Sequence, residues 1–165
     1  GHGLVPIVPV AVIFDLGVGD GRIRPDAEAG YRACAAASRD APAQGNVGAG
    51  SGALVGKLLG AERAMKGGVG TASVSAAGHT VGALIVCNAV GDVLDPASGR
   101  LLAGARSADG STLQDTRQAL LQGLQARHAL AGQNTTIGVI ATDAVLYKAQ
   151  AQRLAQVAHD GLARS

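Results

Sequence analysis

The tripeptide formed by Asn134, Thr135 and Thr136 directly precedes a β-rich apolar run, residues 137–141, and is the best candidate for chemistry in the sequence. A hydroxyl that follows a strained peptide bond at the start of a strand can attack the preceding carbonyl. Hydrolysis of the resulting ester would leave Thr135 as a new N-terminus. Its α-amine, with an ordinary pKa of about 7.7–8.0, can then act as the base for its own hydroxyl. The competing interpretation is a loop that leads into a strand, and the tripeptide alone favours it.

An N-terminal nucleophile of this kind also needs hydrogen-bond donors for the oxyanion and a cation that keeps its amine neutral. Lys57 and Asn88 are plausible for these roles, since each lies at the end of a glycine-rich or strand-forming segment. A surface lysine and a turn-capping asparagine are the competing interpretations. The residue types by themselves favour those interpretations.

Other common reactive motifs are incomplete or missing in the sequence. The glycine-rich stretch that ends at Lys57 departs from a phosphate loop, since Ser51 stands where its first Gly belongs and Leu58 where its Mg²⁺-binding hydroxyl belongs. The 4 histidines are far apart and form no zinc pattern, and no Gly-x-Ser-x-Gly elbow is present. The sequence therefore predicts no metal and no organic cofactor, and it disfavours the alternative of a nucleotide-binding α/β domain.

Composition sets the class of protein. The 165 residues are 47% hydrophobic and 16% charged, which suits one domain, residues 1–165. The formal net charge is only +2, with the two signs interspersed, and the sequence has no Trp, so neither a nucleic acid nor a membrane is expected as a partner. The longest apolar stretch is too short to span a bilayer, and no cysteine framework indicates secretion. These features predict a soluble, cytoplasmic protein.

Periodicity and turn residues predict an α+β chain with a layered α/β arrangement. The expected helices are residues 26–38, 113–130 and 150–162. The expected strands are residues 69–76 and 80–89, joined as a hairpin, and residues 135–141. Residues 4–14 are expected to form a buried extended segment, and residues 15–25, 42–56 and 90–111 to form loops. The chain opens in apolar sequence and ends within a helical pattern, which predicts a segment of a longer protein.

Several stretches, taken together and in order, resemble the DmpA-like family of self-processing N-terminal-nucleophile hydrolases. That family includes L-aminopeptidase/D-esterases, β-peptidyl aminopeptidases and nylon-oligomer hydrolases. The matching stretches are residues 5–9 (VPIVP), 12–16 (VIFDL), 66–73 (KGGVGTAS), 86–91 (VCNAVG), 95–96 (DP), 134–139 (NTTIGV), 141–144 (ATDA) and 158–164 (AHDGLAR). They cover nearly the whole chain and are specific as a set.

The resemblance implies an αββα four-layer sandwich, of which this chain would be an incomplete segment. It implies a precursor that cleaves itself between Asn134 and Thr135, and processed subunits that assemble into a homo-oligomer. Thr135 would be the nucleophile, Lys57 would assist it, and Asn88 would stabilise the oxyanion.

Two further residues follow from the resemblance. Lys66 competes with Lys57 for the role of the active-site lysine, and Lys57 is preferred because it follows the glycine-rich segment. Phe14 stands where some family members have an active-site tyrosine, which places it in the substrate pocket.

The expected function is hydrolysis of an amide or ester bond in a small peptide or amino-acid amide, of the aminopeptidase type and without a cofactor. The alternative from another class is a non-catalytic fragment or structural relative that keeps the fold. Replacement of Thr135 by Ala separates the two, because only an enzyme would lose self-cleavage and hydrolysis.

Overall fold

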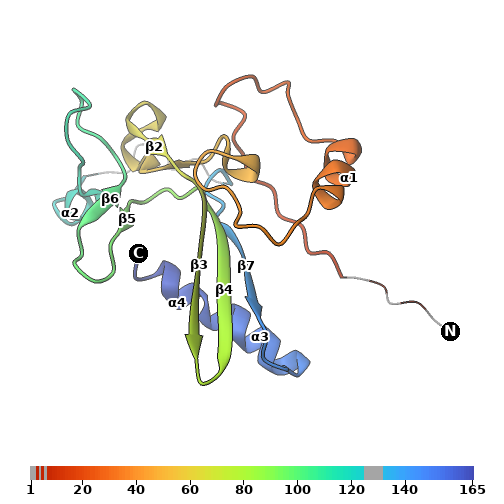
Figure 1. The fold of residues 1–165 in the computed structure, drawn as a ribbon. Coiled ribbons are helices and arrows are strands. Elements are labelled where there is room, and N and C mark those ends of the chain that lie inside the picture. Colours follow the sequence, from red (N-terminus) through yellow and green to blue (C-terminus); the bar gives the residue numbers. More distant parts are fainter. Residues whose placement is uncertain (1–2, 4, 6, 125–131) are drawn as a thin grey trace.

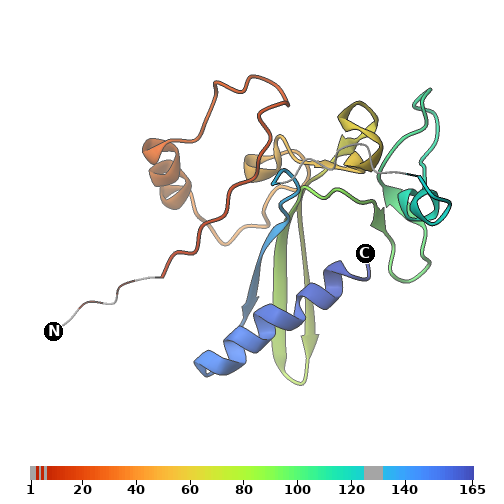
Figure 2. The same cartoon turned by 180° about the vertical axis from the view of Figure 1, so that it is seen from behind.

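The computed structural model describes residues 3, 5, 7–124 and 132–165 and shows an α+β fold. Its largest sheet is antiparallel, with the strands in the order β3 (Gly68–Ala76), β4 (His79–Cys87) and β7 (Ile137–Thr142). The helices α3 (Lys148–Val157) and α4 (His159–Leu162) lie across one face of this sheet, as Figures 1 and 2 show from opposite sides. The described part of the chain therefore contains a sheet with a helical layer on one face.

The β3–β4 hairpin confirms the sequence prediction for residues 69–89. Its two-residue turn consists of Ala77 (φ 51°) and Gly78 (φ 79°), and two positive φ angles in succession match the right-handed twist of paired strands. The register runs from Ala76 opposite His79 to Gly68 opposite Cys87. Because β4 ends at Cys87, Asn88 lies immediately beyond the sheet.

The pairing of β4 with β7 brings two distant parts of the chain to the same end of the sheet. Val86 pairs with Ile137, and the two strands are antiparallel. Asn88 and Thr135 therefore each lie two residues beyond this pair, on the same side of it. The strand predicted over residues 135–141 begins two residues later than expected and ends at Thr142.

The predicted helix over residues 150–162 is confirmed, with a break that divides it into α3 and α4. The backbone N–H of Tyr147 donates to Gln150 Oε1 at 2.8 Å, which satisfies one donor at the start of α3. A cavity of about 950 Å³ separates the two helices from β4 and β7, and apolar side chains such as Val81, Ile140 and Leu154 line it.

A second region lies at one end of the sheet and holds most of the buried side chains (Figure 1). It contains two short antiparallel pairs, β1 (Leu54–Val55) with β2 (Met65–Lys66) and β5 (Val93–Leu94) with β6 (Leu101–Ala103). The short 3-10 helix η1 (Gly48–Gly50) precedes β1, and η2 (Lys57–Leu59) and η3 (Ala61–Arg63) lie between β1 and β2. The prediction of loops over residues 90–111 was therefore incomplete, since it missed the β5–β6 pair.

Glycines allow the backbones of this compact region to approach closely. Gly56 has φ 71°, and a Cβ atom built there would collide with the backbone of Gly104 and Ala105. A Cβ atom at Gly50 would lie 2.7 Å from the amide nitrogen of Val69. The glycine-rich composition thus serves direct backbone packing between segments that are distant in sequence.

The N-terminal segment departs from the prediction that residues 4–14 are buried. Its described residues form no strand, and Val5, Ile7 and Val10 are 84–90% exposed. Because this segment pairs with none of the described sheets, its apolar side chains have no face against which to pack. Figure 1 shows it running outward past α1 (Ala27–Ala35), whose start is capped as predicted by Asp26, which accepts from the amide of Ala29 at 2.8 Å.

The helix expected over residues 113–130 is shorter than predicted within the described part of the chain. It is α2 (Thr116–Leu121), capped by Asp115, and Gly123 follows with φ 89°, a conformation that does not continue a helix. Residues 125–130 of the prediction lie outside the described residues. None of the helices in the described part of the chain combines the length and the apolar character that a membrane crossing requires.

Candidate active site

Two predicted site residues, Lys57 and Asn88, meet where the compact region joins the sheet. Lys57 begins η2 directly after Gly56, and Asn88 directly follows β4. The Lys57 Nζ atom donates to the Asn88 side-chain oxygen at 3.0 Å and to the Asn88 carbonyl at 3.2 Å. The structure therefore brings together two residues that are 31 positions apart in sequence.

Both side chains also reach the segment that holds the predicted cleavage bond. The Gln133 carbonyl oxygen accepts from Lys57 Nζ at 2.6 Å and from Asn88 Nδ2 at 3.2 Å. This carbonyl lies one peptide before the bond between Asn134 and Thr135. An ammonium group and an amide group that converge on one carbonyl oxygen form the donor arrangement that stabilises developing negative charge in acyl transfer.

Asn88 is held rigidly in this arrangement. It is 1% exposed, and its Oδ1 atom accepts from the backbone amide of Leu54 at 3.0 Å as well as from Lys57. Since Oδ1 faces two donors, the side-chain amide can adopt only one orientation, with Nδ2 toward Gln133. The side-chain amide of Asn88, the predicted oxyanion donor, is thus fixed by its own hydrogen bonds.

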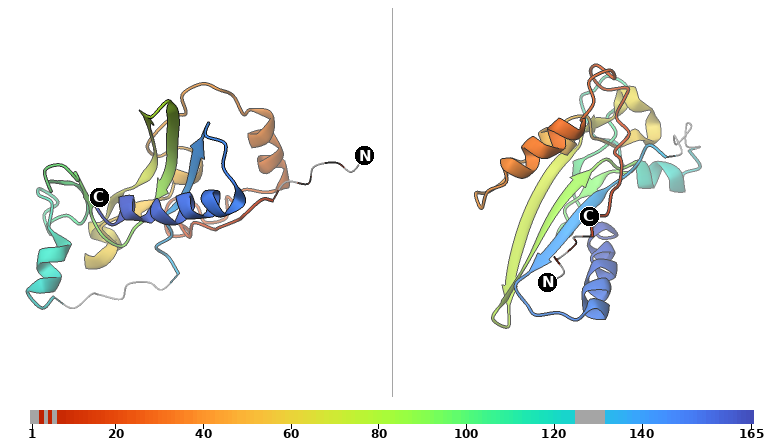
Figure 3. Two further views of the ribbon diagram at one scale, coloured as in Figure 1. Left: turned by 90° about the horizontal axis from the view of Figure 1, so that it is seen from below. Right: turned by 90° about the vertical axis from the view of Figure 1, so that its right-hand side faces the viewer.

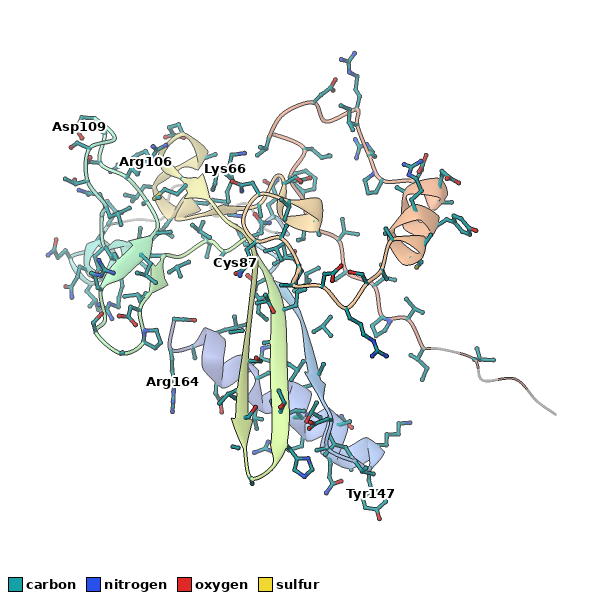
Figure 4. The ribbon with its side chains drawn as sticks, in the orientation of Figure 1. Lys66, Cys87, Arg106, Asp109, Tyr147 and Arg164 are labelled. Carbon is teal, nitrogen blue, oxygen red and sulfur yellow. The ribbon has the colours of Figure 1, made fainter. Side chains whose placement is uncertain are left out.

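The Lys57 ammonium is electrostatically unusual. Burial lowers its pKa below the ordinary value for lysine, and the charge interaction with Cys87 acts in the opposite direction. Cys87 is half-buried at the end of β4, and Figure 4 shows it where the sheet meets the compact region. A lysine in such a site keeps its charge less readily than one in solvent, so its oxygen acceptors help to retain it.

The backbone around Lys57 binds the same loop that its side chain binds. The Gly56 amide donates to the Gly91 carbonyl at 2.7 Å, and the Leu58 amide donates to the Val90 carbonyl at 3.2 Å. The residues on both sides of Lys57 are therefore anchored to the loop that begins at Asn88. This anchoring directs the lysine side chain toward Asn88 and Gln133.

Thr135, the predicted nucleophile, is half-buried and lies two residues after Gln133. Among the described residues, its hydroxyl forms no hydrogen bond. Asn134 has interactions of its own. Thr135 thus lies two residues along the chain from the carbonyl to which Lys57 and Asn88 both donate.

The remaining two predicted residues lie outside this cluster of hydrogen bonds. Phe14 is 40% exposed on the N-terminal segment, but its neighbour Asp15 packs against Gly52, where an added Cβ atom would collide with the carboxylate. Lys66 is exposed on β2 and lines a cavity of about 260 Å³ together with Cys87 (Figure 4). The structure thus brings Lys57, rather than Lys66, to Asn88.

Sequence reasoning missed the part played by Gln133. Its contribution is a backbone carbonyl, which every residue has, so no side-chain pattern indicates it. Across the described ranges, the His, Cys, Asp and Glu side chains form no group of three or more placed to hold a metal ion.

The fold and the site define an α+β protein in which a lysine and an asparagine converge next to a threonine-containing loop. The sequence matches the model of peptidase family S58 over residues 2–165, and the chain belongs to that family.

Curated relatives agree with this assignment. The chain is 50% identical over 172 residues to an uncharacterized aminopeptidase of Mycobacterium leprae, a match that covers 99% of this chain and 45% of the relative. It is 47% identical over 168 residues to uncharacterized aminopeptidases of Mycobacterium tuberculosis and Mycobacterium bovis, with 99% of this chain and 46% of each relative covered. The chain thus spans less than half the length of these relatives.

Proposed function

We propose that this chain carries the core of a self-processing hydrolase of the aminopeptidase type, in which cleavage between Asn134 and Thr135 frees Thr135 as the nucleophile. The observation that carries the proposal is the convergence of Lys57 Nζ and Asn88 Nδ2 on the carbonyl of Gln133. Membership of peptidase family S58 and the similarity to proteins named aminopeptidases support it.

The processing step would use the chain's own groups. The Thr135 hydroxyl adds to the carbonyl carbon of Asn134, the C–N bond breaks, and the leaving nitrogen takes up a proton to become the α-amine of Thr135. The acyl group then rests on Thr135 Oγ as an ester. Water hydrolyses this ester, which leaves a carboxylate on Asn134 and restores the hydroxyl of Thr135.

Turnover would follow the same course with an external substrate. The α-amine of Thr135 accepts the proton of its own hydroxyl, which attacks the substrate carbonyl, and the released amine leaves with that proton. The Asn88 amide donates to the oxyanion, and the Lys57 ammonium lowers the proton affinity of the nearby amine, so that more of it is neutral. Water then releases the acyl group from Thr135.

The contacts of Gln133 suggest why cleavage would activate the site. In the uncleaved chain, its carbonyl occupies the donors of Lys57 and Asn88 that a substrate carbonyl would need. After cleavage, Gln133 would lie next to a new chain end, and its carbonyl could withdraw from these donors. The segment before the cleavage bond would thus give way to the substrate.

The proposal extends to the whole fold and assembly. The helices α3 and α4 cover one face of the sheet (Figure 3), and on β7 the side chain of Val139 is 63% exposed. These features are compatible with two layers of an αββα sandwich, completed and assembled as a homo-oligomer of processed subunits. Phe14 would contribute to the substrate pocket, since its neighbour Asp15 packs against Gly52 near the site.

Substitutions at two neighbouring threonines test the proposal. In the protein expressed as its gene encodes it, Thr135→Ala should abolish both chain cleavage and release of amine from amino-acid amides, with a loss of at least about 10³-fold. Thr135→Ser should retain both activities, because it keeps a hydroxyl at the same atom. Thr136→Ala is the matched control and should leave both nearly unchanged.

The competing function is that of a non-catalytic relative that keeps the fold. A Thr135→Ala protein that cleaves itself and hydrolyses substrate at the wild-type rate would refute Thr135 as nucleophile. A wild-type protein that shows neither self-cleavage nor hydrolysis would support the hypothesis of a non-catalytic relative.

A further inference from the structure

Asp92 is a half-buried carboxylate that binds two distant parts of the compact region. Its Oδ1 atom accepts from the backbone amide of Ala105 at 3.1 Å. Its Oδ2 atom accepts from the backbone amide of Thr116 at 2.8 Å and from the Thr116 hydroxyl at 2.7 Å. Ala105 is 0% exposed and Thr116 is 4% exposed, so these bonds lie in the interior.

Asp92 stands at the far end of the loop that positions Lys57. The loop begins at Asn88, whose side-chain oxygen accepts from the Lys57 ammonium. Carbonyl groups in the middle of the loop accept from the amides of Gly56 and Leu58. The five residues 88–92 therefore bind the Lys57 side chain and the amides of its two neighbours, and Asp92 fastens them to the interior.

Close backbone packing also links Asp92 to η2, the short helix that begins with Lys57. A Cβ atom at Gly104 would collide with the carboxylate of Asp92, and one at Gly56 would collide with the backbone of Gly104 and Ala105. The segment that Asp92 binds is thus the same segment against which Gly56 packs. A shift of Asp92 would therefore move both the loop 88–92 and the segment of Gly104 and Ala105, which together hold the start of η2.

We propose that Asp92 is a positioning residue that holds the loop Asn88–Asp92, and through it the Lys57 ammonium, in place beside Asn88 and Gln133. This inference deepens the proposed function and rests on it for the role of Lys57. Asp92 itself lies away from the reacting atoms and acts through the loop and through Gly56. Loss of its bonds to Ala105 and Thr116 would let the lysine turn relax and admit water to the ammonium.

Asp95 provides a matched control for Asp92. It is a carboxylate three residues further along the chain. Among the described residues it binds only its own turn, through the amide of Ala97 at 3.1 Å and the Ser98 hydroxyl at 2.5 Å. Asp92→Asn should slow chain cleavage about tenfold or more, since small displacements of positioning groups have effects of this size. Asp95→Asn should leave the rate within about twofold of wild type, because its bonds hold no part of the lysine site.

A second readout, the titration of the Lys57 ammonium followed by NMR, does not depend on catalysis. In the wild-type protein we expect Lys57 to titrate below an ordinary lysine, and in Asp92→Asn we expect its midpoint to return toward the ordinary value. A purely structural role would lower stability and leave the midpoint of the folded protein unchanged. Cys87 is the neighbour whose charge interaction acts on the Lys57 pKa.

Two milder variants cover the case in which Asp92→Asn fails to fold. Thr116→Val removes one hydroxyl bond to Asp92 and should produce a smaller shift in the same direction, and Thr116→Ser should restore wild-type behaviour. An unchanged Lys57 titration in Asp92→Asn, or in Thr116→Val if the former does not fold, would overturn the positioning role. If the wild-type chain never cleaves but its Lys57 midpoint still depends on Asp92, the positioning role stands and the proposed function fails.

Discussion

The sheet and the compact region differ in how many of their side chains are buried. The strands β3, β4 and β7 form the largest sheet of the described chain, yet Val86 is the only one of their side chains that is buried. Apart from α2, the compact region consists of two-residue and three-residue elements, and it holds Ala53, Val55 and Asn88, each at most 1% exposed. Long regular hydrogen bonding and deep burial therefore lie in different parts of this molecule.

This difference bears on where a reactive site can be built. One apolar face of the sheet lines a cavity of about 950 Å³, so few side chains on that face are packed on every side. In the compact region, glycines let backbones touch, and the carbonyls and amides that come together hold Lys57 and Asn88. The compact region therefore positions the polar groups. The register of the sheet brings residues 133–135 next to the compact region.

The largest effect should come from filling the closest backbone contact of the compact region. Gly56→Ala would force a residue with a Cβ atom into φ 71° and against the backbone of Ala105. We expect a loss of about 3 kcal/mol or more in the free energy of unfolding, measured by urea denaturation. Gly70→Ala on β3 is the control, since an added Cβ atom meets nothing within 4 Å there, and stability should be unchanged or rise by up to about 1 kcal/mol. Equal losses at both positions would contradict the contrast between the regions.

A smaller effect should come from removing the buried amide of the site. Asn88→Ala would leave the Leu54 amide without its acceptor and deprive Lys57 of an oxygen ligand, so we expect a loss of about 2–3 kcal/mol in unfolding free energy. Asn46→Ala is the matched control, because Asn46 also donates to a backbone carbonyl, that of Gly67 at 3.0 Å, but is exposed. Its loss should be about 0.5–1 kcal/mol. Similar losses for the two asparagines would argue against a rigid, buried site.

The smallest effect concerns the pH dependence of stability. The pKa of Lys57 is lower in the folded protein than in the unfolded chain, so above the folded value the unfolded chain holds more protons, and stability rises with pH up to the ordinary lysine value. Lys57→Met should remove this alkaline rise, as followed by thermal unfolding across the alkaline range. Lys66→Met should retain it, because Lys66 is exposed. A rise that persists in Lys57→Met would show that another group causes it.

The sequence was sufficient for elements that are specified locally. The hairpin follows from Ala77 and Gly78 between two β-rich runs, and the start of α1 follows from the cap at Asp26. The association of Lys57, Asn88 and Thr135 was inferred from resemblance, since nothing in their spacing indicates it.

The features that the sequence did not reveal depend on contacts between distant segments. The burial expected for residues 4–14 failed because apolar composition does not say whether a partner strand is present. Within the described residues, the helix predicted over residues 113–130 is shorter than expected because Gly123, which follows α2, adopts a positive φ. The carbonyl of Gln133 and the carboxylate of Asp92 act through backbone geometry, which no residue pattern encodes.

The most direct test of the site is the intact mass of the protein under denaturing conditions, measured on the form that its gene encodes. We expect two pieces, one that ends at Asn134 and one that begins at Thr135, and a single uncut chain for Thr135→Ala. A wild-type protein that remains one chain after prolonged incubation, or that is cut at another bond, would contradict the assignment of Thr135 as a self-released nucleophile.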